Sequence, residues 1–538
     1  MDHRVAIRAH VLPQDPVVTL EPEDVADGAL NASRRGRELA ELASRTEPLD
    51  VLVVGGGITG VGVALDAASR GLSVALVEAQ DLAFGTSRWS SKLVHGGLRY
   101  LASGNVGIAH ESAVERHRIM TDIAPHLVRP MTQVLPVFTG SPVLGRLVTR
   151  AGMFAGDLLR HNAKTSAELL PRSRTVSGEK AAELVPGLRR DGLRSAVLAA
   201  DGQLVDDARL VVAVARTAAA HGAIILTYTR ATEVTGDGAT LTDVRTGRRV
   251  AVKARSVINA TGVWAGQVDR SITLRPSRGT HLVVSAQALG NPTGALTVPV
   301  AGSISRFVFA LPQQLGRVFI GLTDEDAPGP IPDEPRPTEA EIDMLLETIN
   351  KALARPLDRS DILGVFSGLR PLVDQVGAGV EMSTSDLSRK HLVAYTGGMI
   401  TVVGGKLTTY RQMAEQAVDV ALTRSGVPAG PCITANLPLI GASGAAVDSA
   451  LPPSLIARFG GESEHVMAVA TTDRPAALIA PGIDVTRAEI EFAITHEGAC
   501  TVSDILARRT RIGLVPGDAD LAAGAVAQIL DGAAETSA

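Results

Sequence analysis

The sequence predicts an α/β protein in three parts. A strand, a glycine turn and a helix follow one another near residue 50, strand signals cluster over roughly 276–365, and the pattern beyond residue 425 is mainly helical. We therefore expect a parallel-sheet unit over 47–425, an antiparallel sheet inserted into it over roughly 276–365, and a C-terminal helical domain over 426–538. A chain of 538 residues exceeds what one hydrophobic core usually supports, which agrees with more than one domain.

The unit near residue 50 has the pattern of a nucleotide-binding βαβ motif. An apolar strand ends at Val54, glycines follow as G-x-G-x-x-G over 55–60, and a second strand ends at Glu78. Free backbone N–H groups at the start of the helix can bind a pyrophosphate, and an acidic side chain after the second strand can accept hydrogen bonds from ribose hydroxyls. Because strand, turn, helix and acid agree, the sequence predicts a Rossmann-like dinucleotide-binding domain.

Periodicity and the positions of glycine and proline predict the later elements. In chain order they are helices over 107–124 and 207–222, a strand over 223–234, a strand ending in a small-residue turn at 259–262, strands over 279–285 and 306–322, a proline-dense connector over 328–337, a helix over 338–353, and a strand that passes through glycines at 404–405 into a helix. Small, hydroxyl-bearing residues also fill a segment over 85–101. Several separate segments can thus bring backbone close to one flat ligand.

Composition excludes some classes of protein. The 45% hydrophobic and 20% charged residues are ordinary for a folded globular chain. Lysine and arginine total 52 against 57 acidic residues, so the net charge is −5 and no nucleic-acid partner is expected. The two cysteines, Cys432 and Cys500, have no zinc-site spacing, and no metal site is expected. Their small number favours the cytoplasm, although a single bridge between them stays open.

The N-terminal residues contain no uninterrupted apolar core, so no secretory signal is expected, and 1–46 is interpreted as an extension of unassigned role. No uncharged apolar run is long enough to predict a membrane-spanning helix. Residues 143–161 combine apolar residues with arginines, which fits either an interfacial helix or a helix packed on the core. Any membrane contact is therefore expected to be peripheral.

Only one complete dinucleotide fingerprint is present, so we expect one dinucleotide rather than a pair between which hydride passes. The scattered glycine-rich segments favour FAD, because its isoalloxazine ring reaches far from the first helix and needs walls from distant parts of the chain. With FAD as the sole dinucleotide, the electrons must leave to an acceptor other than a pyridine nucleotide.

Five segments closely resemble the FAD-dependent glycerol-3-phosphate dehydrogenases. They are residues 53–60, 90–101, 259–264, 366–372 and 404–411. The resemblance runs from about residue 48 to about residue 520 and includes a late segment at 507–514. The chain departs from the family pattern at Arg88–Trp89, where small or polar residues are usual, and in its longer N-terminal extension.

The resemblance implies oxidation of sn-glycerol 3-phosphate to dihydroxyacetone phosphate, with hydride passing to FAD and electrons to a membrane quinone. It also implies peripheral contact with the cytoplasmic face of a membrane. The residues expected to bind the cofactor are Gly55, Gly57, Ile58, Thr59, Gly60, Glu78, Thr86, Ser87, Ser90, Ser91, Lys92, His95, Gly96, Gly97, Ala260, Thr261, Gly262, Trp264, Gly404, Gly405, Leu407 and Thr408.

A phosphate monoester calls for guanidinium or ammonium donors. Arg370, at an apparent strand end, is the first candidate, and Lys406 is expected to bind the phosphate or to polarise the substrate oxygen. The family-matching segments add Arg99, Tyr100 and Arg411 as substrate-binding residues.

Removal of hydride from the substrate carbon also requires a base for the hydroxyl proton. His281 matches the family's active-site histidine, and histidine titrates in the appropriate range. A packed strand histidine is the alternative interpretation of this residue. We therefore expect His281, Arg370 and Lys406 to carry the chemistry.

Three other functions stay open at this point. A glycerol-3-phosphate oxidase would perform the same half-reaction with oxygen as acceptor. An amine or amino-acid oxidase would share the flavin fold, but the 366–372 segment does not support it. A flavin-binding protein without activity would hold a cofactor that substrate does not bleach. Two roles are open for the C-terminal domain: packing on the catalytic unit, or mediating a homodimer.

Overall fold

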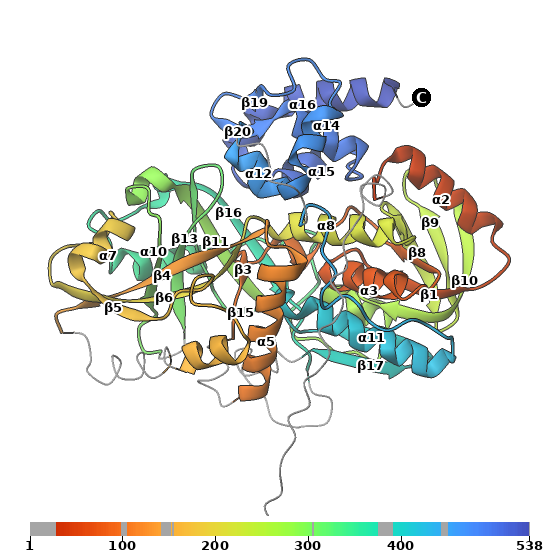
Figure 1. The fold of residues 1–538 in the computed structure, drawn as a ribbon, viewed down its shortest axis with the longest axis horizontal. Helices are drawn as coiled ribbons and strands as arrows, with labels where there is room; N and C mark the ends of the chain where they lie inside the picture. The colour runs from red at the N-terminus through yellow and green to blue at the C-terminus, as the bar shows by residue number, and fades with distance from the viewer. Residues whose placement is uncertain are drawn as a thin grey trace, which may run out of the picture.

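The computed structural model places two β-sheets side by side, with the C-terminal domain above the junction between them (Figure 1). It describes residues 28–97, 105–140, 152, 155–303, 306–374, 391–442 and 450–536. Arg99, Tyr100, residues 1–27 of the predicted extension and most of the 143–161 segment lie outside the described residues.

The first sheet has eight strands and contains the predicted nucleotide-binding unit. Its main path runs in the order β17 (Leu392–Thr396), β18 (Met399–Val403), β10 (Arg249–Asn259), β1 (Leu49–Val54), β2 (Val74–Val77) and β7 (Ile224–Leu226), and β8 (Thr229–Thr235) and β9 (Gly238–Asp243) extend it from β10. β1 pairs in parallel with β10 on one side and β2 on the other. The predicted Rossmann-like topology is therefore confirmed.

Three helices pack against this sheet or against one another. They are α3 (Ile58–Ser69), α8 (Asp207–Ala220) and α11 (Tyr410–Ser425). Small residues allow α3 and α11 to approach closely, since a Cβ added at Gly62 would lie 2.9 Å from the Tyr410 ring. This packing sets the start of α3 at the carboxyl end of β1, where the glycine turn lies.

The second sheet has ten strands and draws on more of the chain than the predicted insertion. Its strands are β3 (Leu93–Val94), β4 (Val128–Phe138), β5 (Arg174–Ser177), β6 (Leu193–Leu204), β11 (Ser277–Ser285), β12 (Ala295–Pro299), β13 (Phe307–Pro312), β14 (Arg317–Gly321), β15 (Glu325–Asp326) and β16 (Ile362–Arg370). β12 pairs in parallel with β4, and that pairing joins the predicted insertion to an earlier segment. The other pairs are antiparallel, as predicted.

Further helices before β17 are α5 (Val106–Arg118), α7 (Gly178–Leu184), α9 (Ala265–Val268) and α10 (Glu339–Asn350). The Thr338 side chain caps α10, and the Glu341 carboxylate accepts a hydrogen bond from the Thr338 backbone N–H. α5 stands between the two sheets in Figure 1.

Three predicted strands are divided in the structure. The expected strand over 306–322 forms the hairpin β13–β14, because Leu315 and Gly316 both have positive φ angles. The expected strand over 223–234 divides into β7 and β8, because Tyr228 adopts a left-handed backbone with φ of 51°. The segment before residue 404 forms the hairpin β17–β18 rather than one strand, because Gly397 and Gly398 both have positive φ angles.

Part of the predicted extension belongs to the nucleotide-binding unit. Helix α2 (Ala32–Ser44) buries Leu39 and Leu42 against the apolar residues of β1, β2 and β10. Arg35 on the same helix pairs with Asp243 at 2.7 Å. Residues 32–44 of the predicted extension therefore pack on the nucleotide-binding unit.

The C-terminal domain is mainly helical, as predicted, with one small hairpin. Its elements are α12 (Pro453–Phe459), α13 (Ser463–Ala468), β19 (Leu478–Ala480), β20 (Ile483–Thr486), α14 (Arg487–Thr495), α15 (Val502–Asp504) and α16 (Pro516–Thr536). Buried ion pairs attach it to α8: Arg216 pairs with Glu462 at 2.7 Å, and Arg209 pairs with Glu497. Within the described residues, no helix has the length and apolar character needed to cross a membrane.

Candidate active site

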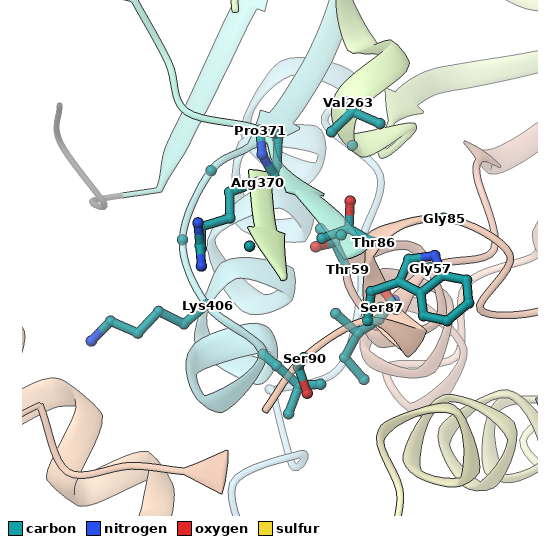
Figure 2. Close-up of a pocket in the computed structure, with 18 of the residues that line it drawn as sticks. Gly57, Thr59, Gly85, Thr86, Ser87, Ser90, Val263, Arg370, Pro371 and Lys406 are labelled. Atoms are coloured by element: carbon teal, nitrogen blue, oxygen red, sulfur yellow. The ribbon is translucent and has the colours of Figure 1, made fainter. Parts of the chain in front are cut away.

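A cavity of about 1300 Å³ runs between the two sheets. It begins at the glycine turn after β1 and ends at Arg370 and Lys406. Its volume exceeds the roughly 300–1000 Å³ of ordinary small-molecule sites, which suits a long ligand. Figure 2 shows Arg370 and Lys406 extending to one side of the cavity, with Gly57, Thr59 and Ser87 on the other.

The glycine turn brings backbone close to the cavity. Gly55 has a φ of +113°, and a Cβ there would lie 2.6 Å from the carbonyl oxygen of Ala260. A Cβ at Gly60 would lie 1.9 Å from the carbonyl oxygen of Gly55, so this position serves the close packing of helix on turn. Gly57 and Thr59 open α3 at the cavity wall, where helix N–H groups favour a phosphate.

Glu78 lies at the carboxyl end of β2 and lines the cavity. Its carboxylate accepts hydrogen bonds from the N–H groups of Gly56 at 2.7 Å and Gln80 at 2.8 Å. Burial raises the pKa of this carboxyl above its ordinary value. The two backbone donors fix the carboxylate beside the turn, as a ribose-binding acid requires.

The segment after β2, residues 84–95, forms another wall, which we call the cofactor loop. Ser87 Oγ accepts the Ile58 N–H at 2.9 Å, which ties this loop to the start of α3. Thr86 Oγ1 donates to the Leu369 carbonyl at 2.6 Å, which ties it to β16. The Ser90 hydroxyl donates to Asp207 at 2.7 Å. The loop is therefore held by α3, by β16 of the second sheet and by α8.

Arg370 and Lys406 bring positive charge to the far end of the cavity. The Arg370 guanidinium donates to Ser277 Oγ at 3.1 Å and to the Thr323 carbonyl at 3.0 Å, and it pairs with Asp324 at 3.1 Å. Lys406 Nζ donates to the Ser112 hydroxyl at 2.6 Å. These contacts orient two cations that come from different sheets toward one region.

His281 lies behind the cavity wall rather than in its lining. The side chain is fully buried, and its ring stacks on Phe366 with centroids 4.7 Å apart. Nε2 lies 2.9 Å from the hydroxyl of Ser91, which does line the cavity. Burial, with smaller contributions from the Lys92 and Arg370 charges, holds the pKa of His281 well below 6.5. The imidazole is therefore neutral at pH 7, and its low pKa makes it a weaker base than an exposed histidine.

We expect this histidine to make folding stability depend on pH. Below pH 6.5 the unfolded chain binds a proton at position 281 and the folded protein does not, so stability falls as the pH falls. His281→Gln keeps a polar group beside Ser91 and should reduce the loss by up to about 1.4 kcal/mol per pH unit. Urea midpoints of the two proteins between about pH 7 and pH 5 measure the difference, and equal slopes would contradict it.

Most of the predicted cofactor residues line the cavity. They are Gly55, Gly57, Ile58, Thr59, Glu78, Thr86, Ser87, Ser90, Ser91, His95, Ala260, Thr261, Gly262, Trp264, Gly404, Gly405, Leu407 and Thr408. Segments separated by more than three hundred residues thus meet around one space. This lining fits a dinucleotide with its pyrophosphate at α3 and its ribose at Glu78.

Other predicted residues lie outside the lining, and their contacts indicate structural roles. Gly60 packs on the turn. Lys92 is buried and donates to Asp207 at 2.7 Å. Gly96 and Gly97 permit close packing on α5, since an added Cβ would lie 2.3 Å from Arg116 and 3.0 Å from Ala109 respectively.

Arg411, predicted to bind substrate, is placed away from the cavity. Its guanidinium donates to both carboxylate oxygens of Glu115, at 2.8 and 2.9 Å, and to Glu415 at 2.7 Å. The structure therefore gives it the role of joining α11 to α5.

Several lining residues were not predicted. Gln133, Arg306, Phe309 and Asp324 come from strands or turns of the second sheet. None belongs to a glycine-rich segment, and no local signal in the sequence separates them from ordinary strand residues. No group of acidic, histidine and cysteine side chains suited to a metal ion occurs in the described part of the chain.

Comparisons with known proteins find related sequences over most of the chain. A family model described as FAD dependent oxidoreductase matches residues 50–411, and one described as the C-terminal domain of alpha-glycerophosphate oxidase matches residues 432–537. The chain is 59% identical over 496 residues to glycerol-3-phosphate dehydrogenase 1 of Mycobacterium tuberculosis, covering 91% of this chain and 96% of that protein.

Two solved structures are similar in fold. One is the glycerol-3-phosphate dehydrogenase of Bacillus halodurans complexed with FAD, with 25% identity, a TM-score of 0.68, and coverage of 93% of this chain and 94% of that one. The other is the L-alpha-glycerophosphate oxidase of Mycoplasma pneumoniae with FAD bound, with 17% identity, a TM-score of 0.54, and coverage of 73% and 99%.

Proposed function

The chain belongs to the FAD-dependent glycerol-3-phosphate dehydrogenase family, and from this premise we propose that it passes electrons from sn-glycerol 3-phosphate to a membrane quinone. The observation that carries the proposal is that the glycine turn, Arg370 and Lys406 all line the same cavity. When bound there, FAD would accept the hydride from the substrate. Dihydroxyacetone phosphate is the product.

Three roles are proposed for the chain's own residues. Arg370 binds the substrate phosphate, supported by the contacts that fix its guanidinium at the cavity end. Lys406 binds the same phosphate or polarises the reacting oxygen. His281 receives the hydroxyl proton through Ser91, because the Ser91 hydroxyl lies in the lining and only 2.9 Å from Nε2.

A quinone stays in the bilayer, so this acceptor requires the protein to contact the cytoplasmic face of a membrane peripherally. A homodimer mediated by the C-terminal domain was one of two open interpretations of the sequence and stays untested. Oxygen is the competing acceptor, favoured by the match of residues 432–537 to a domain named for an oxidase.

The rate at which the reduced holoenzyme is reoxidised distinguishes quinone from oxygen as the acceptor. We expect a soluble short-chain quinone to reoxidise anaerobically reduced protein much faster than air-saturated buffer does, with little hydrogen peroxide formed. Fast reoxidation by oxygen, with one hydrogen peroxide per flavin and no response to quinone, would contradict the quinone proposal and support the oxidase. Stopped-flow absorbance of the flavin, with a peroxide assay on the same samples, measures both.

A further inference from the structure

Arg88 and Trp89, where the chain departs from the family pattern, lie in the middle of the cofactor loop. Arg88 is fully buried. Its Nε donates to the Phe84 carbonyl at 2.9 Å, and its Nη2 donates to the Glu334 carboxylate at 2.8 Å. Trp89 lines the cavity between Ser87 and Ser90. Trp89 therefore faces the cavity, whereas Arg88 does not line it and is packed among other groups of the protein.

Arg511 of the C-terminal domain reaches these two residues. Its side chain is buried, and Nη2 donates to the Arg88 carbonyl at 2.6 Å. Its Cζ atom lies 5.4 Å from the centre of the Trp89 ring, within the range of a cation–π contact. Nε lies 3.1 Å from the carboxylate of Asp206, the residue that caps α8. One side chain thus joins the C-terminal domain, the cofactor loop and α8.

The Arg88 carbonyl also accepts a hydrogen bond from Lys92. Lys92 Nζ donates to the Arg88 carbonyl at 2.9 Å and to Asp207 at 2.7 Å. Trp89 in turn stacks on Phe366 at 5.8 Å, and Phe366 stacks on His281. A series of direct contacts therefore links Arg511 to Trp89, which lines the cavity, and through Phe366 to His281, which lies behind its wall.

The C-terminal domain also holds the chain immediately before the cofactor loop. Arg508 and Arg509 both pair with the fully buried carboxylate of Asp81, at 2.6 and 2.8 Å. Arg511 itself is held from the second sheet, since Arg317 donates to its carbonyl at 2.8 Å. The domain is thus anchored near both ends of the segment from Asp81 to Arg88.

We propose that Arg511 is a positioning residue for the cofactor loop, and that tight binding of FAD depends on the docked C-terminal domain through it. The proposal concerns cofactor binding alone and does not depend on which acceptor takes the electrons. Arg511 does not line the cavity, so it acts through Arg88 and Trp89 rather than by touching the cofactor.

The test compares Arg511→Met and Arg511→Lys with Arg458→Met and Arg458→Lys in the full-length chain. Arg458 is a matched control because it is equally buried in the C-terminal domain, where it pairs with Glu489. Its other contacts are with Asp484 and Gln314, not with the cofactor loop. Each apoprotein is titrated with FAD, and the visible circular dichroism of the bound flavin and the Tm of the apoprotein are recorded.

We expect Arg511→Met to raise the Kd for FAD about tenfold and to alter the flavin dichroism, with a smaller rise for Arg511→Lys. The Arg458 variants should lower the apoprotein Tm but leave the Kd unchanged. An unchanged Kd in the Arg511 variants, or an equal rise in both series, would overturn the proposal. If Arg511→Met does not fold, the comparison of the two lysine variants decides in the same way.

Discussion

Gly60→Ala is expected to produce a protein that is isolated without yellow colour. The added methyl would lie 1.9 Å from the carbonyl oxygen of Gly55, and the obstacle is backbone, so no side-chain rotation relieves the contact. The start of α3 must therefore shift away from the turn that binds the pyrophosphate. We expect the Kd for FAD to rise at least about 100-fold, or roughly 2.7 kcal/mol.

Gly524→Ala is the matched control, because it also adds one methyl to a helix but meets no atom within 4 Å. Flavin content after purification and a fluorescence titration of the apoproteins measure the effect. Normal flavin content in Gly60→Ala would contradict the assignment of this turn to the cofactor.

Arg370→Ala is expected to raise the KM for sn-glycerol 3-phosphate about 100-fold, or roughly 2.7 kcal/mol, with flavin content unchanged. A phosphate that loses a fixed guanidinium loses charge-assisted hydrogen bonds that no water molecule replaces in kind. The KM for the quinone should change little, because the acceptor carries no phosphate. Arg370→Lys should have a KM for sn-glycerol 3-phosphate between those of the unaltered protein and of Arg370→Ala, since lysine keeps the charge but not the planar fork.

Arg275→Ala provides the control for this substitution. Arg275 pairs with Asp326 outside the large cavity and should leave both KM values near those of the unaltered protein. Equal increases in the KM for substrate and quinone in Arg370→Ala would argue against a phosphate-binding role.

The sequence predicted best the features that depend on local geometry. A strand, a glycine turn, a helix and Glu78 lie within thirty residues, and each has a recognisable requirement for its residue type. The turns at Thr261 and Gly404 were found for the same reason, because small residues let backbone approach a ligand.

Long-range pairing explains what was not predicted. The second sheet depends on the pairing of β12 with β4, which joins Ala295 to Gln133, and no local pattern specifies that partner. Arg411 has the residue type and the setting of a phosphate ligand, but its partner Glu115 lies 296 residues earlier in the chain. The buried contacts of Arg511 with the cofactor loop are equally non-local.

Anaerobic titration of the purified holoenzyme with sn-glycerol 3-phosphate tests the central claim most directly. If one cavity holds both FAD and the phosphate ester beside it, the flavin absorbance near the visible maximum should bleach completely and dihydroxyacetone phosphate should form in equal amount. Glycerol, which lacks the phosphate, should leave the absorbance unchanged at the same concentrations. A yellow protein whose flavin is not bleached by sn-glycerol 3-phosphate would contradict the account.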